Sequence, residues 1–230
     1  MSLRSWIPKL AGQRVLVIGD VILDEYLIGS ATRLSREAPV PVLEFESRQL
    51  IPGGAANPAA NIVGLGSATI QVGVIGSDTE ATALRQVLQA RGIETAALVV
   101  DSGRPTTVKT RVMAQMGLRF AQQVARLDRI SREPLSAATE RQVRALIQDC
   151  IASVNAVLIS DYHIGLVTPS LVDAVRLLAA ECQQPPLLTA DAQGQLDKYA
   201  GFGLVTCNAD EARAFLRRSL TTRADFEAAA

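Results

Sequence analysis

Short apolar runs alternate with longer amphipathic stretches along most of the chain. Short strands are predicted by the apolar runs at 14–19, 68–75, 94–100, 156–160, 186–190 and 203–206. Helices are predicted by apolar spacing and cap residues at 55–65, 78–91, 134–154, 168–181, 208–218 and 222–230. This alternation predicts an α/β fold with a doubly wound, mostly parallel sheet.

Two segments, 36–52 and 105–127, break the alternation. Pro39 and Pro41 forbid a helix in the first segment, where apolar and polar residues alternate loosely. The second segment contains two β-like runs on either side of Gly117. Strands that cannot all join the parallel sheet predict a small separate β-sheet. An edge hairpin of the main sheet is the alternative that the sequence leaves open.

Composition narrows the class of protein. The chain has 230 residues and a formal net charge of zero, which predicts one domain over 1–230 and gives no sign of a nucleic-acid or membrane-surface partner. No apolar run reaches the roughly 18 residues of a membrane span, and the N-terminus lacks a secretory signal. Cys150, Cys182 and Cys207 lie far apart, so a disulfide framework or zinc site is not expected and a reducing cytoplasm is.

A glycine pair, Gly53-Gly54, precedes the predicted helix 55–65. Glycine lets the backbone approach a ligand closely, because it has no Cβ and tolerates positive φ. The free N–H groups of a helix start favour polar or anionic ligand groups. The alternative is that Asn57 caps the helix and Pro58 occupies its first turn, with no ligand involved.

The run Gly53-Gly54-Ala55-x-Asn57-x-Ala59, followed by Gly66 and Gly76, resembles the N-terminal signature of the ribokinase/PfkB carbohydrate kinase family. The stretches VLVIGDVILDEYLIG, SREAPVPVLEF and PGGAANPAANIVGLG are most similar to the heptose kinases of that family, the kinase domain of ADP-heptose synthase. One departure is Pro58, which lacks the amide hydrogen usual at that position. The resemblance implies ATP and Mg²⁺ as cofactors, and transfer of a γ-phosphoryl group to a sugar or sugar-phosphate hydroxyl.

The same resemblance assigns the sugar-binding residues. Asp24 follows the strand 14–19 and would accept hydrogen bonds from sugar hydroxyls, with Gly53, Gly54 and Asn57 also holding the sugar. The alternative for Asp20 and Asp24 is that they only form a turn, and for Asp20 this is the preferred interpretation. The resemblance further implies that the small β-sheet is a lid over the sugar and a homodimer contact.

Lys109 and Arg111, on the second lid segment, are candidates for binding a phosphate that the sugar already carries. The alternative is a solvated strand face.

Asn208-Ala209-Asp210-Glu211 lies between a predicted strand and helix, and resembles the family's Asn-x-x-Glu motif. The resemblance implies that Asn208 and Glu211 position Mg²⁺ and the nucleotide phosphates without ligating the metal directly, since Mg²⁺ keeps several waters. The alternative is a helix N-cap with acidic residues in the first turn.

Asp161 and Asp191 are expected to support the residues that bind the ligands, without contacting the ligands themselves. In the heptose kinases the run at Ser160-Asp161-Tyr162 continues to a lysine where this chain has Ile164, and Asp191 is followed by Pro-Lys where this chain has Ala-Gln. These two departures weaken the assignment of a heptose phosphate as substrate, but not that of the family. His163, the single histidine, lies in a predicted loop and is expected to be a surface residue or to support the residues that bind the ligands, rather than to be catalytic.

The largest departure is an absence. Family members use a Gly-Ala-Gly-Asp run whose amides hold the transferring phosphoryl group and whose aspartate is the base, and nothing after Asn208 supplies it. Because phosphoryl transfer depends on positioning and charge stabilisation, its loss should cost orders of magnitude in rate. The base is therefore expected beyond Ala230, the chain is expected to be the first two-thirds of a kinase, and these 230 residues are expected to be inactive alone.

Two other functions compete with a sugar kinase. A non-catalytic sugar-binding or regulatory protein on a kinase fold would also lack the Gly-Ala-Gly-Asp run. A nucleotide-binding oxidoreductase would share the strand–helix alternation, but the first strand is followed by no G-x-G-x-x-G, and no P-loop occurs.

Overall fold

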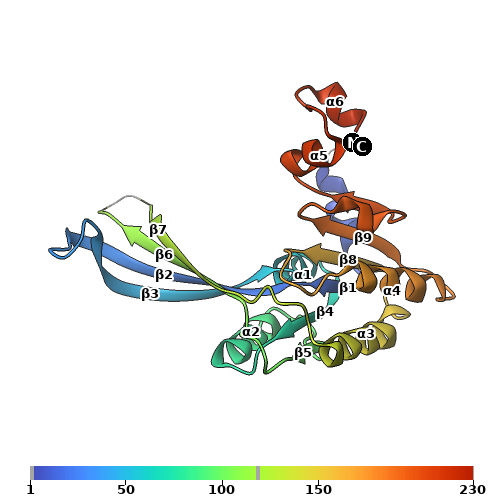
Figure 1. The fold of residues 1–230 in the computed structure, drawn as a ribbon, viewed down its shortest axis with the longest axis horizontal. Coiled ribbons are helices and arrows are strands. Elements are labelled where there is room, and N and C mark those ends of the chain that lie inside the picture. The colour runs from blue at the N-terminus through green and yellow to red at the C-terminus, as the bar shows by residue number, and fades with distance from the viewer. Residues whose placement is uncertain (1–2, 118–119, 230) are drawn as a thin grey trace.

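A computed structural model describes residues 3–117 and 120–229 of the chain (Figure 1). Its main sheet has six strands in the order β10-β9-β8-β1-β4-β5, and every neighbouring pair is parallel. The strands are β1 (Arg14–Gly19), β4 (Ala68–Ile75), β5 (Leu98–Val100), β8 (Ala156–Asp161), β9 (Leu187–Ala192) and β10 (Leu204–Thr206). The predicted parallel α/β fold is confirmed.

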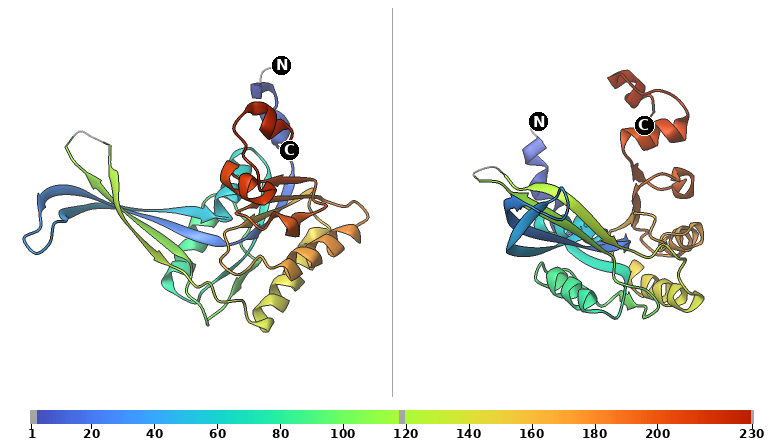
Figure 2. Two further views of the ribbon diagram at one scale, coloured as in Figure 1. Left: turned by 45° about the horizontal axis from the view of Figure 1, so that its top comes forward. Right: turned by 60° about the vertical axis from the view of Figure 1, so that its left-hand side comes forward.

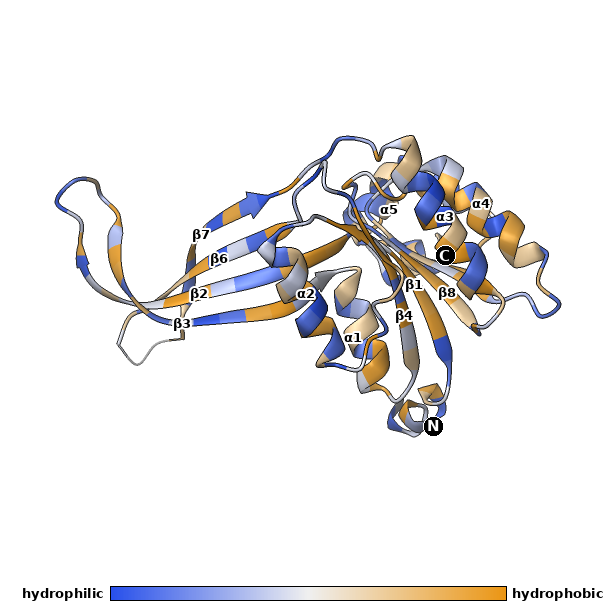
Figure 3. Cartoon of the chain, turned by 90° about the horizontal axis from the view of Figure 1, so that it is seen from below, coloured by the Kyte–Doolittle hydropathy of each residue, from blue (hydrophilic) through white to orange (hydrophobic). Residues whose placement is uncertain are grey.

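Helices cover both faces of this sheet, with α1 (Ala56–Gly64) and α2 (Thr79–Gln89) on one face and α3 (Ala137–Ile151) and α4 (Pro169–Ala180) on the other. Helices α5 (Ala209–Leu216) and α6 (Arg223–Glu227) follow β10 and lie outside these layers (Figure 1). Short 3-10 turns are η1 (Leu3–Ser5), η2 (Ile7–Leu10) and η3 (Leu196–Tyr199). Side chains alternate along β1: Leu16 and Ile18 pack with α3 and α4, whereas Val17 packs with α1 and α2. Because the strands are buried on both faces, their sequences are continuous apolar runs. Strands β1 and β8 are accordingly coloured mostly as hydrophobic (Figure 3).

A second sheet of four strands extends away from this body (Figures 1 and 2). We call it the lid; its strands are β2 (Val21–Leu34), β3 (Pro41–Gly54), β6 (Val108–Gln115) and β7 (Gln122–Arg129), in the order β3-β2-β6-β7. β2 and β3 are antiparallel, as are β6 and β7, whereas β2 and β6 are parallel. The lid is thus a separate sheet, and the edge-hairpin alternative is wrong.

Strand β2 is the main element that the sequence pattern did not predict. The first lid segment was expected at 36–52, but residues 35–40 connect two long strands, and the hairpin spans 21–54. Polar residues occupy both faces of β2: Asp24 points to one side, and Glu25 to the other, where Arg48 Nε lies 2.6 Å from its carboxylate. Because both faces carry polar side chains, no period-2 alternation marks the strand.

Other boundaries differ by a few residues. The helix predicted at 168–181 is α4, in which Thr168 is the N-cap and Pro169 occupies the first turn. The predicted strand 94–100 is shorter than expected, because only 98–100 forms β5 and Glu94 makes a single bridge to Ile70. Within 3–117 and 120–229, no helix is long and apolar enough to cross a membrane.

Candidate functional site

The strand order of the main sheet reverses at β1, whose neighbours are β4 on one side and β8 on the other. Crevices at such reversals, at the carboxyl ends of the strands, are where open α/β sheets bind ligands. Asp20 directly follows β1, and its N–H donates to the carbonyl of Ser160, 3.3 Å away in β8. Asp161 ends β8, and Gly54 lies against the carbonyl oxygen of Asp20, so these residues meet at this junction.

Asp24 and Gly53 face each other closely on β2 and β3. A Cβ on Gly53 would lie 2.5 Å from Asp24 Oδ2, so any larger residue would displace the carboxylate. Gly54 has φ +54°, and a Cβ there would lie 2.3 Å from the carbonyl oxygen of Asp20. The glycine pair therefore ends β3 and shapes the backbone around two aspartates, just before α1 begins.

Arg111 is paired with Asp24. Its Nη1 lies 2.7 Å from Asp24 Oδ1, and its guanidinium lies 5.2 Å from the ring centre of Tyr26. The two charged side chains are only 20% and 16% exposed. Burial is the largest influence on the pKa of Arg111 and lowers it, but the hydrogen bond and charge of Asp24, together with Tyr26 and Asp128, outweigh burial and raise the pKa of the guanidinium. Arg111 is thus a half-buried, partnered group, and the solvated-face alternative is wrong for it.

Strand register divides the lid into two faces. In the register of β2 and β6, Asp24 lies opposite Lys109 and Tyr26 lies opposite Arg111, so these four residues share one face. Glu25, Thr110 and Leu127 are successive register partners on the other face. We call the first the site face and the second the back face. Lys109 Nζ lies 5.5 Å from the ring centre of Tyr162, which shows that the site face looks toward the β8 loop.

Tyr162, which the sequence analysis did not select, links the two halves of the site. Burial raises the pKa of its phenol, and the nearby charges of Asp191 and Asp24 raise it further. Asp191 in turn accepts a hydrogen bond from Thr206 Oγ1 at 2.9 Å, next to the start of α5. A line of polar groups therefore runs from Asp24 past Tyr162 and Asp191 to β10. A tyrosine immediately after a strand-end aspartate was the only signal.

Asp161 is buried rather than open to a ligand. It is 1% exposed, and its Oδ2 lies 2.6 Å from Lys198 Nζ and 2.9 Å from the hydroxyl of Tyr199. Burial and this carboxylate raise the pKa of the Tyr199 phenol. Lys198 also was not selected, because nothing in its local sequence connects it to β8. It places an ammonium group beside the loop in which Ile164 stands instead of a lysine.

Asn208 and Glu211 form a capping box at the start of α5. Asn208 Oδ1 accepts from the N–H groups of Asp210 and Glu211 at 3.0 and 2.9 Å, and the N–H of Asn208 donates to Glu211 Oε2 at 2.7 Å. The N-cap alternative is therefore realised. By contrast, Asn57 does not cap α1: Ala55 is the N-cap, and Asn57 is exposed on the first turn.

The side-chain oxygens of Asn208 and Glu211 are better suited to accept hydrogen bonds from waters bound to Mg²⁺ than to coordinate the ion directly. Their side chains already accept backbone N–H groups, and the oxygen donors that remain suit a hydrated Mg²⁺. In the described ranges, no group of three or more His, Cys, Asp or Glu side chains is arranged to hold a metal.

Sequence comparisons identify the relatives. A model of the pfkB family of carbohydrate kinases matches residues 13–230. The bifunctional protein HldE of Helicobacter pylori (strain ATCC 700392 / 26695) is 37% identical over 218 residues, which make up 94% of this chain and 46% of that protein. The HldE protein of Geobacter metallireducens is 40% identical over 200 residues, covering 86% and 39%. The chain thus spans less than half the length of these curated relatives.

Solved structures share the fold at low sequence identity. Phosphofructokinase-2 from Escherichia coli in complex with fructose-6-phosphate gives a TM-score of 0.69 at 18% identity, covering 96% of this chain and 69% of that one. Arabidopsis thaliana ribokinase complexed with ribose and ATP gives 0.64 at 16%, covering 95% and 67%. The fold is therefore ribokinase-like, with a small second sheet. Because the family model spans residues 13–230, this chain belongs to the pfkB family of carbohydrate kinases.

Proposed function

We propose that this chain provides the sugar site and the phosphate-positioning groups of an ATP- and Mg²⁺-dependent carbohydrate kinase, which transfers the γ-phosphoryl group to a sugar or sugar-phosphate hydroxyl. The observation that carries the proposal is the Asp24 carboxylate on β2, the strand that follows β1 at the sheet reversal, where it is held against Gly53 and paired with Arg111. Membership of the pfkB family supports it.

Asp24 has acceptor capacity left for a sugar. A carboxylate offers about four lone-pair sites, and the hydrogen bond from Arg111 occupies one, at Oδ1. Two neighbouring hydroxyls could therefore donate to the remaining sites. Gly53 keeps space at this point because it has no side chain; Gly54 follows it, and Asn57 lies exposed in the first turn of α1. Asp24 would thus bind and orient the sugar, and the site face of the lid would exclude water above it.

Arg111 and Lys109 favour a sugar that already carries a phosphate. A guanidinium has five N–H donors in all, and Asp24 accepts from only one of its nitrogens. Lys109 adds a second cation on the same face. At the other end of the site, Asn208 and Glu211 would position ATP phosphates and hydrated Mg²⁺, whose charge would neutralise the transferring group. Asp161 and Asp191 would support the loops between these ends.

The sequence contains no Gly-x-Gly-Asp run after Asn208, so we propose that these 230 residues bind sugar but transfer phosphate slowly. The second candidate function, a sugar-binding or regulatory protein, is favoured by the same observation. We further propose a cytoplasmic location, consistent with the free cysteines at 150, 182 and 207, and a homodimer formed through the lid.

The test is product formation. The chain is incubated with ATP, Mg²⁺ and either ribose, fructose 6-phosphate or a heptose 7-phosphate, and sugar phosphate and ADP are followed by ³¹P NMR. We expect slow, sugar-dependent ADP formation with a phosphorylated sugar, and less with Arg111→Ala. Binding of a sugar with no ADP formed over days would favour the regulatory function. Binding of none of the three would contradict the proposal.

A further inference from the structure

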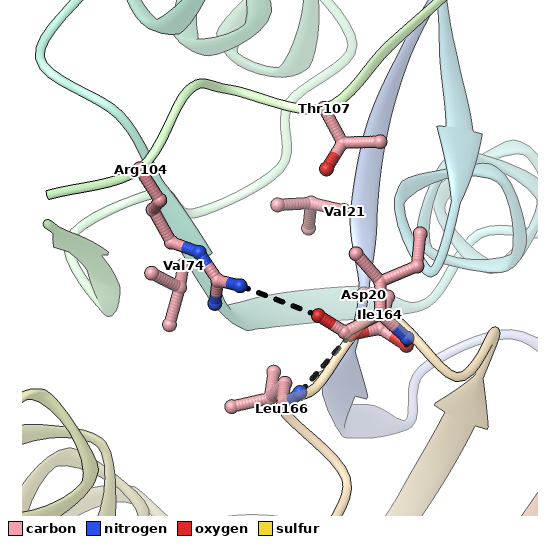
Figure 4. Close-up of a pocket in the computed structure, with 7 residues that line it drawn as sticks. All are labelled: Asp20, Val21, Val74, Arg104, Thr107, Ile164 and Leu166. Atoms are coloured by element: carbon pink, nitrogen blue, oxygen red, sulfur yellow. Dashed lines mark hydrogen bonds between the residues drawn. The ribbon is translucent and has the colours of Figure 1, made fainter. Parts of the chain in front are cut away.

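The carboxylate of Asp20 holds the loop that follows β8. Its Oδ2 accepts hydrogen bonds from the backbone N–H groups of Tyr162 and Ile164 at 2.9 and 3.2 Å. Its Oδ1 accepts from the N–H of Leu166 at 3.4 Å (Figure 4). Asp20 is 6% exposed. An ionised carboxylate has only acceptors, so it suits three converging N–H donors. The preferred sequence interpretation, that Asp20 only forms a turn, is therefore wrong.

The backbone of Asp20 joins the same loop to the glycine pair. Its carbonyl oxygen accepts from the N–H of Ala55 at 3.0 Å, and its N–H donates to Ser160. The carbonyl is approached so closely by Gly54 that a Cβ would not fit there. One residue thus connects the end of β1, the turn into α1 and the loop after β8.

Arg104 secures the opposite side of the loop. Its Nη2 donates to the carbonyl oxygens of Ile164, Ser131 and Glu133 at 3.4, 3.3 and 3.0 Å. Asp20, Arg104 and Thr107 line a small polar cavity of about 10 Å³ (Figure 4), room for roughly one water molecule. The carbonyl of Thr107 accepts from the N–H of Leu23 at 2.9 Å, so this cluster lies where the lid leaves the body.

We propose that Asp20 is a positioning residue that fixes the Tyr162–Leu166 loop and thereby sets the Tyr162 ring as a wall of the site, between Asp24 and Asp191. The consequence for sugar binding rests on the proposed function. The loop itself is a property of the folded chain and is measurable without any ligand.

The test compares Asp20→Asn with the unmutated 230-residue chain, using Asp173→Asn, an exposed carboxylate on α4, as the matched control. An asparagine has the size of Asp20, but its NH₂ group would face N–H donors. We expect amide hydrogen exchange at Tyr162, Ile164 and Leu166 to accelerate about tenfold or more, while amides of Leu84 and Leu88 in α2 keep their rates. We also expect the Nuclear Overhauser contact between Tyr162 and Lys109 to weaken.

Ligand affinities distinguish a positioning role from a general effect on folding, because a general effect would not weaken sugar binding selectively. For whichever of fructose 6-phosphate, ribose and a heptose 7-phosphate binds the unmutated chain most tightly, we expect Asp20→Asn to weaken sugar binding about tenfold, while MgATP affinity changes by less than about twofold. Unchanged exchange at the three amides, or faster exchange with unchanged sugar affinity, would overturn the proposal.

Two further outcomes remain decisive. If no sugar binds the unmutated chain, the proposed function fails, and the exchange rates and the Tyr162–Lys109 contact alone decide whether Asp20 positions the loop. If Asp20→Asn does not fold, a pH titration of the unmutated chain decides it. The three amide resonances should then move together with one midpoint; independent or absent shifts would contradict the proposal.

Discussion

At the scale of single residues, Gly53 makes the sharpest prediction. Gly53→Ala would place a methyl group 2.5 Å from Asp24 Oδ2, so the carboxylate must move. We expect a loss of about 1–3 kcal/mol in the free energy of unfolding or an equivalent loss of sugar affinity. The control is Gly64→Ala at the end of α1, where a Cβ meets no atom within 4 Å. This variant should be neutral or stabilising by up to about 1 kcal/mol. Equal effects of the two substitutions, by urea unfolding and calorimetry, would refute the role of Gly53.

Asp20 predicts a pH dependence of stability. Burial raises its pKa in the folded chain and the charge of Asp161 adds to this, while the N–H groups of Tyr162, Ile164 and Leu166 oppose it. Arg104 lines the same cavity, and Tyr199 lies close enough for its own pKa to be raised slightly by Asp20. The folded chain binds the proton of Asp20 more tightly than the unfolded chain does. The contribution of Asp20 to the free energy of unfolding is therefore present below about pH 4 and is lost as pH rises through the folded-state pKa.

The measurement is urea unfolding of the unmutated chain and Asp20→Asn between about pH 3.5 and 7. The difference in free energy of unfolding, unmutated minus variant, should fall with rising pH in this window, by at most about 1.4 kcal/mol per pH unit. Other groups, such as Asp78 with its lowered pKa, cancel in this difference. A difference that stays constant with pH would show that Asp20 does not titrate abnormally.

Residue-level inference from sequence succeeded where a motif is local and failed where partners are distant. The glycine pair and Asp24 were selected, and the structure places them together, although their role in binding stays a prediction. Lys198 and Tyr162 were not selected, because their importance comes from contacts with Asp161 and with Lys109 and Asp24 that only the fold creates. Asp20 was misinterpreted because a turn aspartate and a buried loop anchor have the same local sequence.

At the scale of elements, variants of Asn208 at the start of α5 can distinguish a helix-capping role from a role in nucleotide binding. Asn208→Ala removes the capping box and should destabilise the chain by about 1 kcal/mol, whereas Asn208→Ser keeps a capping oxygen and should not. If Asn208 also positions phosphates, both variants should bind MgATP about tenfold more weakly, since a hydrogen bond to a charged group is lost. Calorimetric titration with MgATP together with urea unfolding decides between these roles. A serine variant that binds MgATP normally would restrict Asn208 to capping.

Element prediction was accurate for the sheet body and weaker for the lid. Strands buried on both faces, such as β1 and β8, carry continuous apolar runs and were predicted closely. Strand β2 was missed because Asp24 serves the site face while its neighbour Glu25 serves the back face, paired with Arg48 and Thr110. A strand with polar partners on both sides has no alternation to detect.

At the scale of the whole molecule, the lid predicts the state of association. On its back face Leu127 is 70% exposed, and Phe45, also 70% exposed, pairs with Gly29 on the same face. If two lids associate through this face, Leu127→Lys should yield monomers, because an ammonium would be buried at the interface. Leu177→Lys on α4, where the leucine is 67% exposed, should leave the mass unchanged. Analytical ultracentrifugation gives the masses; a monomeric unmutated chain, or a dimeric Leu127→Lys, would contradict the lid contact.

The central claim is that the Asp24 side of the lid binds a sugar, and calorimetric titration of fructose 6-phosphate, ribose and a heptose 7-phosphate tests it most directly. The control is built into the strand: Glu25 is the next residue but points to the back face. We predict that at least one sugar binds, that Asp24→Asn weakens it by about tenfold or more, and that Glu25→Gln does not. Failure of all three sugars to bind, or equal affinities of Asp24→Asn and the unmutated chain, would contradict the account.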